Sequence, residues 1–349
     1  MYILHIISVL ILSMFGMLLI IPIIVLGLPL WAVNFFTIVF SRFFGPKFVS
    51  WQDLIEFNQS IGWKPKPNLD NYYLTQVGDG VYHVNTDSQG WLGNSSSIDK
   101  SEVVVFGDSY AFGYGVNSND CFFSVLSGKT HIKSIGAPGY NMVQGIILMS
   151  QLYSQLKNKL VVWFIYSGND LFENLLPNFN HYRMPFVREV NGNGDWEIVT
   201  SHIRPERWVL ASKTNYYKKI AEICSSTFLA QRAYSACEFL VEKARDICRE
   251  ANSCLVVVNI PDVSQMNKKK IELLYKLAPD KSSFDPDLPD RKIREICCKL
   301  DVRFVALKDH LGIDDYKKLD PHWNERGHKR VAEVLYGLYK DYSLKEIRV

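Results

Sequence analysis

The sequence predicts an α/β protein with a mostly parallel sheet and helices on both faces. The apolar run at 103–106 stops at Gly107, which is typical of a strand that is buried on both sides. Further strands are predicted at 132–135, 160–166, 255–260 and 302–305, and the run at 160–166 is a strong buried strand. Stretches with helical spacing lie between them, at 142–156 and 233–250. This alternation of strands and helices predicts the fold class.

The composition indicates which kinds of partner the chain is expected to bind and whether disulfides are expected. The chain has 349 residues, 48% of them hydrophobic, which is enough for one large or two ordinary domains. Its 39 basic and 36 acidic residues leave a net charge of +3, so no basic field indicates a nucleic-acid partner. The seven cysteines have no regular spacing, which favours reduced core residues over a disulfide framework.

The first 44 residues are expected to form a transmembrane segment. Residues 6–40 contain no Asp, Glu, Lys or Arg, and as a helix they would reach roughly 50 Å, against about 30 Å of hydrocarbon. Pro22 and Pro29 lie near the middle, so one kinked helix and a short hairpin both remain open. A cleaved signal peptide is the alternative, but there is no basic n-region and the stretch is too long. Arg42 and Lys47 follow the segment, which favours a cytoplasmic soluble part.

Residues 45–100 connect this segment to the α/β part of the chain. Pro65 and Pro67 favour extended backbone around Trp63, so this region, called the strap below, is expected to lie on the soluble domain as a semi-rigid connection. Within it, residues 81–86 alternate like a strand before the turn residues at 87–90. The predicted domains are therefore residues 1–44, the strap, and residues 101–349.

Ser109 is a candidate nucleophile. It follows the strand at 103–106 through Gly107 and Asp108, which places its hydroxyl at the carboxyl end of a parallel strand. Ligands bind and chemistry takes place at this edge of an open α/β sheet. The structural alternative is that Ser109 only caps the helix that follows.

Two further strands end in small or polar residues that suit an oxyanion hole. Gly139 follows the second strand and Asn169 the third. The amides of Ser109 and Gly139, with the Asn169 side chain, would supply the donors that a tetrahedral acyl intermediate needs. The alternative is that Gly139 only shapes a turn and Asn169 only caps a helix.

A base is expected near the carboxyl end of the chain. Asn324 is a suitable N-cap for an amphipathic helix, which places Asp320 and His322 in the preceding loop. There His322 can take the proton of Ser109 while Asp320 orients the imidazole. His328 lies inside the helix and is expected to be structural. A metal site of Asp320, His322 and His328 is an alternative that no further cluster of ligands supports, so neither a metal nor a cofactor is expected.

These blocks resemble the SGNH hydrolase superfamily, also called GDSL esterases and lipases. Gly107-Asp108-Ser109-Tyr110, Gly139, Gly168-Asn169-Asp170 and Asp320-Pro321-His322 occur in the family's order, within residues 102–341. The resemblance implies a three-layer α/β/α, flavodoxin-like fold, with Ser109 as nucleophile, Gly139 and Asn169 in the oxyanion hole, and His322 as base.

The sequence departs from the best-known members at two places. Only Pro321 separates Asp320 from His322, where those members have two residues, and Ser167 stands where many have Gly. The short spacing resembles membrane-anchored and polysaccharide-modifying relatives, as does the lead-in at 62–90. That likeness implies an extracytoplasmic site, against the charge and cysteine signals, so the side of the membrane remains open.

Residues 171–251 form an insertion longer than a strand-to-strand crossover needs. Its runs at 186–190 and 196–199 flank the turn residues 191–195, which predicts a hairpin that walls or covers the site. Tyr182, Trp196 and Trp208 are candidates to stack on sugar rings, with packing as the alternative.

The sequence therefore predicts a membrane-anchored serine esterase or O-acyltransferase, acting on acyl esters, acetyl above all, of a glycan or lipid-linked glycan. Water resolves the acyl-enzyme in the first case and a glycan hydroxyl in the second. One alternative is a non-enzymatic accessory subunit of a multi-pass membrane acyltransferase. Another is a lysophospholipase or lipase with its own anchor.

Overall fold

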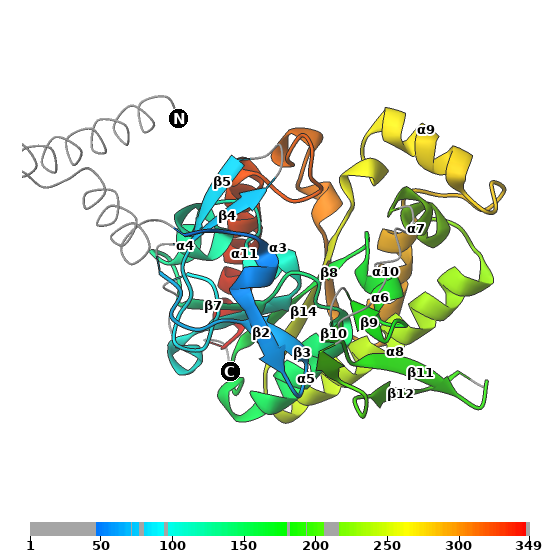
Figure 1. Ribbon diagram of the computed structural model, residues 1–349. Coiled ribbons are helices and arrows are strands. Elements are labelled where there is room, and N and C mark those ends of the chain that lie inside the picture. Colours follow the sequence, from blue (N-terminus) through cyan, green and yellow to red (C-terminus); the bar gives the residue numbers. More distant parts are fainter. Residues whose placement is uncertain are drawn as a thin grey trace, which may run out of the picture. The chain divides into compact units, whose positions relative to one another are not determined.

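The computed structural model describes residues 47–70, 72–76, 80–93, 97–179, 182–192, 194–205 and 216–346. The predicted transmembrane segment lies outside these residues, and the described part contains no helix long and apolar enough to cross a membrane. The chain divides into two compact units, Met1–Lys47 and Phe48–Val349. Apart from Lys47, every element below belongs to the second unit (Figure 1).

A five-stranded parallel sheet forms the centre of the second unit, as the sequence predicts. Its spatial order is β7-β6-β8-β14-β15. The sequences of β6, β8 and β14 are nearly continuous apolar runs, because both faces of the sheet are buried there, whereas β7 contains Lys133 and Ser134. The strands are β6 (Val103–Gly107), β7 (Ile132–Gly136), β8 (Leu160–Tyr166), β14 (Cys254–Ile260) and β15 (Arg303–Ala306).

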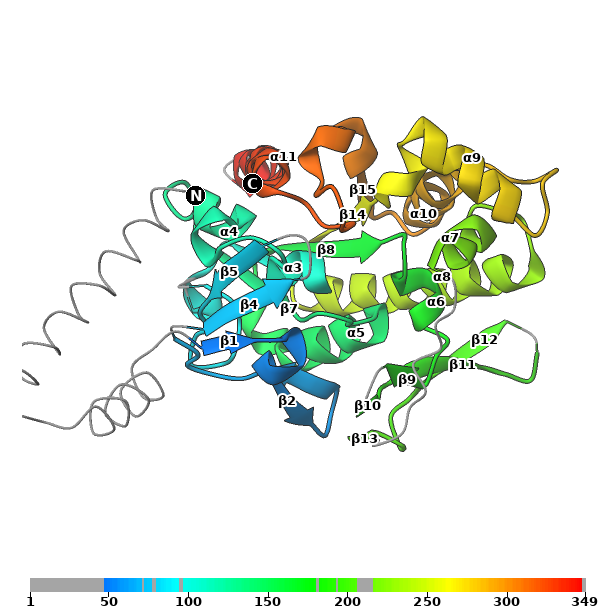
Figure 2. The same ribbon diagram turned by 45° about the horizontal axis from the view of Figure 1, so that its top comes forward.

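Helices cover both faces of this sheet, which makes three layers. Alternate residues of β6 enter different cores: Val104 and Phe106 pack with α5, α8 and α10, whereas Val103 and Val105 pack with α4 and α11. Figure 2 shows α11 on one side of β8, and α5 and α8 on the other. The helices are α3 (Ser109–Phe112), α4 (Phe122–Leu126), α5 (Met142–Gln151), α6 (Asp170–Glu173), α7 (Tyr216–Ile223), α8 (Phe228–Glu250), α9 (Lys268–Leu277), α10 (Leu288–Lys299) and α11 (Glu325–Glu346).

The strand order reverses direction between β6 and β8. The chain moves from β6 outward to β7, then crosses back to β8 and continues to β14 and β15. At such a switch point the loops that leave the two neighbouring strands diverge, and a crevice opens at their carboxyl ends. Ser109 follows β6 as the first residue of α3, and Asn169 follows β8 as the residue before α6, so both lie at this point.

The strap lies on the α/β core. The strand predicted at 81–86 is present at Gly80–Val84, but the strap also contains strands that its proline-rich sequence does not predict. β2 (Ile55–Asn58) and β3 (Gly62–Pro65) form an antiparallel hairpin. β1 (Lys47–Val49), β4 (Tyr72–Gln76) and β5 (Gly80–Val84) form a separate sheet. Trp63 on β3 is fully buried. Lys133 of β7, 1% exposed, forms an ion pair with Asp87 of the strap.

The insertion contains the predicted hairpin. β11 (Phe186–Val190) and β12 (Asp195–Val199) pair antiparallel, with Val190 opposite Asp195. The short strands β9 (Asn178–Phe179), β10 (Tyr182–Arg183) and β13 (Arg204–Pro205) form a second small sheet. Of the three aromatic candidates, Trp208 lies outside the described residues.

No disulfide joins the seven cysteines, all of which lie in the described part of the chain. Five of them are buried, as expected of reduced core residues, while Cys254 is half-buried and Cys298 is exposed. Burial raises the pKa of the Cys297 thiol to about 12 and that of Cys248 to about 12. The buried thiols are thus protonated at neutral pH.

Candidate active site

Ser109 occupies the first turn of α3, but its side chain does not cap that helix. The cap is Asp108, whose carboxylate accepts the Tyr110 backbone N–H at 3.0 Å. The capping alternative for Ser109 is therefore wrong. Its Oγ lies 2.7 Å from His322 Nε2 and 3.2 Å from Asp108 Oδ2, and the residue is 8% exposed.

The turn that carries Ser109 packs directly against the end of β7. Gly107 and Gly136 are register partners, and a Cβ on Gly136 would lie 2.6 Å from the Gly107 carbonyl oxygen and 2.7 Å from that of Asp108. No side chain fits at this position. The glycine therefore permits the close approach that fixes the Ser109 turn at the sheet edge.

His322 and Asp320 lie in the loop before α11, as predicted. The Asp320 carboxylate contacts Nδ1 of His322 and also accepts the His322 backbone N–H at 2.9 Å. An Nδ1–H that donates to this carboxylate leaves Nε2 as the acceptor that faces Ser109. The Asn324 side chain accepts the N–H groups of Arg326 and Gly327, each at 3.0 Å, and so caps α11.

Asp320 is held in its ionised form. Burial acts to raise the pKa of this carboxyl group, but the hydrogen bonds and charge of His322, with the charge of Lys317, outweigh it and hold the pKa below its usual range. A carboxylate is thus present throughout the neutral pH range, where an imidazolium at His322 would need a counter-charge.

Aromatic rings fix the imidazole in place. The ring centroids of Tyr110 and Tyr114 each lie 4.8 Å from that of His322. The Tyr110 hydroxyl donates to the carbonyl of Pro321 at 2.7 Å, and its ring packs edge-on against Trp323. The base is therefore held from both sides by residues that follow Ser109 and by its own chain neighbours.

Gly139 lies in a tight turn after β7. Its φ of +77° is in the region that favours glycine, and a Cβ there would lie 2.1 Å from the Phe179 ring. Phe179 belongs to β9 of the insertion, so it is this short strand that contacts the predicted oxyanion residue. No motif in the sequence marks Phe179 as a residue of the site.

Asn169 precedes α6, but its side chain makes no capping hydrogen bond. Instead Nδ2 donates to Glu173 Oε2 at 2.9 Å, which leaves the second amide hydrogen for another acceptor. Oδ1 is buried and has no hydrogen-bond partner among the described residues. Asn169 thus occupies the N-cap position of α6, but its side chain does not cap the helix, and its amide is instead oriented by the carboxyl group of Glu173.

Three acidic side chains are buried beside the Ser109 turn. Burial raises the pKa of Glu173 to about 7, helped by the charge of Asp108 and opposed by Lys219 and by the hydrogen bond from Asn169. Burial also raises the pKa values of Asp108 and Asp170, and the charge of Asp108 raises that of Asp170 further. The charge of Asp108 thus acts on both acidic side chains of α6.

His328 is buried in α11, as predicted, and does not face a metal site. Its Nδ1 accepts the Phe122 backbone N–H at 3.3 Å, and burial lowers its pKa to about 3. Among the described residues no group of three or more His, Cys, Asp or Glu side chains is arranged to hold a metal ion.

Two of the aromatic candidates are engaged in packing. Tyr182 lies 5.4 Å from the Trp63 ring and stacks on Phe57. Trp196 donates its indole N–H to Ser235 of α8 at 2.9 Å, and Arg232 lies over its ring. The packing alternative therefore describes both residues.

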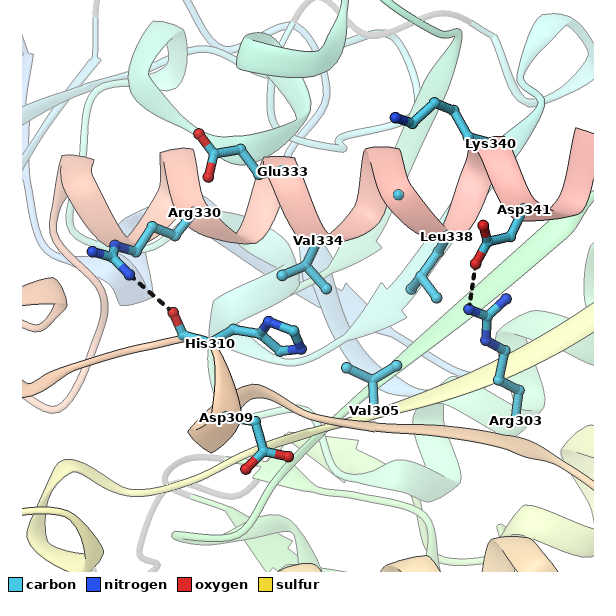
Figure 3. A pocket seen from close by; sticks show the side chains of 11 residues that line it. Arg303, Val305, Asp309, His310, Arg330, Glu333, Val334, Leu338, Lys340 and Asp341 are labelled. Atoms are coloured by element: carbon cyan, nitrogen blue, oxygen red, sulfur yellow. Dashed lines mark hydrogen bonds and ion pairs between the residues drawn. The ribbon is translucent and has the colours of Figure 1, made fainter.

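A groove of about 700 Å³ lies elsewhere, between α11 and β15 (Figure 3). The ion pair between Arg303 and Asp341, at 2.7 Å, closes one end, and Arg330 donates to the His310 carbonyl at the other. None of the predicted site residues lines it. The groove is thus separate from the serine site.

Comparisons with known proteins give remote matches. No family model matches the chain, and neither does any curated protein. A carbohydrate acetylesterase from Sinorhizobium meliloti, Est24, is 13% identical with a TM-score of 0.40, over 69% of this chain and 99% of that one. A GDSL-like lipase from Bacteroides thetaiotaomicron is 9% identical with a TM-score of 0.37, over 71% and 92%. TesA is 12% identical with a TM-score of 0.40, over 69% and 98%.

Proposed function

We propose that this chain is a serine esterase or O-acyltransferase, anchored to a membrane by residues 1–44. The observation that carries the proposal is the continuous series of contacts from Asp320 through His322 to Ser109, with Nε2 and Oγ 2.7 Å apart at the switch point of the sheet. Acyl transfer needs these three parts: an acid that orients the base, the base, and the nucleophile.

The first half of the reaction forms an acyl-enzyme. Ser109 Oγ attacks the acyl carbonyl carbon while His322 Nε2 takes the hydroxyl proton, and Asp320 stabilises the imidazolium. The amides of Ser109 and Gly139, with Asn169 Nδ2, donate to the carbonyl oxygen as it becomes negative. The ester C–O bond then breaks, and His322 returns its proton to the leaving alcohol.

The second half differs between the two activities. In an esterase, water attacks the acyl carbon and loses a proton to His322. The bond between Ser109 Oγ and the acyl carbon then breaks, Oγ takes the proton back from His322, and the acyl group leaves as a carboxylic acid. In an acyltransferase, the hydroxyl of a glycan takes the place of water and leaves as a new ester. Predicted anchoring and family resemblance favour acetyl esters of a membrane-linked or envelope glycan as substrates.

Covalent labelling with a fluorophosphonate probe tests the proposal. We expect the detergent-solubilised full-length protein to be labelled, and Ser109→Ala and His322→Ala each to lose labelling while remaining folded. Labelling that survives Ser109→Ala would contradict the site assignment. A folded wild type that is never labelled would contradict the proposed enzymatic activity. It would favour the alternative of a non-enzymatic accessory subunit, which co-purification of a multi-pass acyltransferase would check. Hydrolysis of lysophospholipid vesicles would instead identify a lipase.

A further inference from the structure

The turn that presents Gly139 has a central peptide with two possible directions. The Tyr140 N–H donates to the Ala137 carbonyl at 3.1 Å, so these residues close a β-turn with Pro138 second and Gly139 third. A φ of +77° at the third position makes it a type II turn. Type I and type II turns differ by roughly a half-rotation of the central peptide.

The direction of this peptide decides where the Gly139 N–H points. The described residues contain no cis peptide, and in a trans peptide the carbonyl and the N–H point in opposite directions. A group that holds the Pro138 carbonyl therefore also fixes the Gly139 N–H on the other side of the peptide plane. A rotated peptide would point this donor away from any oxyanion formed on that side.

Trp63 of the strap holds that carbonyl. Its indole Nε1 donates to the Pro138 oxygen at 3.1 Å, although the two residues are 75 positions apart in the sequence. The hydrogen bond is fully buried, because Trp63 has no exposed surface. A rotated peptide would face the indole N–H with a second N–H and leave buried donors unpaired, which is costly.

The indole is itself held rigidly. The Tyr140 hydroxyl donates to the Trp63 carbonyl at 2.8 Å, and Gln144 Nε2 donates to the carbonyl of Ile61 at 2.6 Å. The Trp63 ring also packs against the rings of Tyr140 and Phe179, at centroid distances of 5.8 and 5.5 Å. The strap, the turn after β7 and the insertion thus meet at this one side chain.

We propose that Trp63 is a positioning residue for acyl transfer at Ser109, because its indole N–H holds the Pro138–Gly139 peptide in the direction that presents the Gly139 N–H to the oxyanion. The inference rests on the function proposed above. Donation to the Pro138 carbonyl also polarises the peptide and strengthens its N–H as a donor. The strap is thereby part of the active site as well as a connection to the predicted anchor.

The test compares Trp63→Phe with the matched variant Trp196→Phe in the full-length protein. Both remove an indole N–H that donates a hydrogen bond, but Trp196 donates to Ser235 on α8 instead of to the turn that presents Gly139. The assay is p-nitrophenyl acetate hydrolysis, with the fluorophosphonate probe titrating the active enzyme so that unfolded protein is not counted. We expect Trp63→Phe to lower kcat about tenfold with KM within about twofold, because the lost interaction acts in the transition state.

Each outcome decides the question. A kcat for Trp63→Phe equal to that of wild type and of Trp196→Phe would overturn the positioning role while the serine enzyme stands. A wild type without Ser109-dependent labelling would overturn the proposed function itself. If Trp63→Phe does not fold, the benzothiophene analogue of tryptophan at position 63 keeps the ring and removes only the N–H; an unchanged kcat there overturns the inference, and a tenfold loss supports it.

Discussion

Asp320 contacts Nδ1 of His322 with its carboxylate, and it also accepts the His322 backbone N–H at 2.9 Å. We expect Asp320→Asn to lower kcat by about 10²- to 10⁴-fold with little change in KM, because the asparagine amide no longer enforces the tautomer that accepts from Ser109. Steady-state hydrolysis of p-nitrophenyl acetate measures this. A loss below threefold would show that Asp320 does not orient the base.

Glu173 is expected to make stability depend on pH. Its pKa is raised by burial from 4.5 to about 7, so the folded state binds this proton more tightly than the unfolded chain does. The stabilising effect of the bound proton is therefore complete below pH 4.5 and is lost as the pH rises through about 7. The difference corresponds to about 3 kcal/mol.

Glu173→Gln isolates this effect from the neighbouring carboxyl groups. We expect the variant to lose less stability than wild type between pH 5 and pH 8, measured by urea unfolding at each pH. Glu272→Gln, on the exposed face of α9, makes the same chemical change and is the control. Parallel curves for wild type and Glu173→Gln would show that Glu173 does not titrate in this range.

At the scale of elements, the strands of the parallel sheet and the strap strand at 81–86 were predictable, whereas the other strands of the strap were not. The apolar run at 160–166 matches β8 residue for residue, because burial on both faces leaves a continuous signal in the sequence. β3 gives no such signal, since it contains Lys64 and Pro65 and is defined by partners elsewhere in the chain. One such distant partner is Pro138, whose carbonyl accepts a hydrogen bond from the Trp63 indole.

In the candidate site too, residues with a local sequence signal were predictable and residues defined by tertiary packing were not. Four candidate site residues were identifiable because each follows a strand or precedes a helix within one of the four family motifs. They are Ser109, Asn169, Asp320 and His322. Glu173 was not, because a glutamate near the start of a helix is ordinarily solvated, and only tertiary packing reduces its exposure to 6%. Residues that position the reacting groups are thus harder to predict than the reacting groups themselves.

The ion pair between Lys133 and Asp87 ties the strap to β7 and predicts unequal effects of removing either charge. Lys133 is 1% exposed and Asp87 20%, so Asp87→Asn leaves the more deeply buried charge without its counter-charge. We expect Asp87→Asn to destabilise the protein by about 3 kcal/mol, and Lys133→Met, which keeps the apolar stem, by less. Urea unfolding of both variants measures this order, and the reverse order would contradict it.

For the whole molecule, Cys298 is a natural reporter of the side of the membrane. It is the exposed cysteine of the seven, while the raised pKa values of the buried thiols make them unreactive. The family resemblance favours an extracytoplasmic site, so we expect a membrane-impermeant maleimide to label intact cells and Cys298→Ser to remove most of that label. Labelling that requires permeabilised cells would place the soluble part in the cytoplasm, as the charges of Arg42 and Lys47 indicate.

The distance in sequence between Ser109 and His322 also sets how long after Ser109 the ribosome makes His322. The two residues are 213 positions apart, and a ribosome adds about 5–20 residues each second, so roughly 10 to 40 seconds separate their synthesis. Throughout this interval the growing chain carries the serine without its base. The proposed reactivity towards esters thus begins only once the loop before α11 has been made and has reached Ser109, long after the apolar segment at 6–40 has left the ribosome.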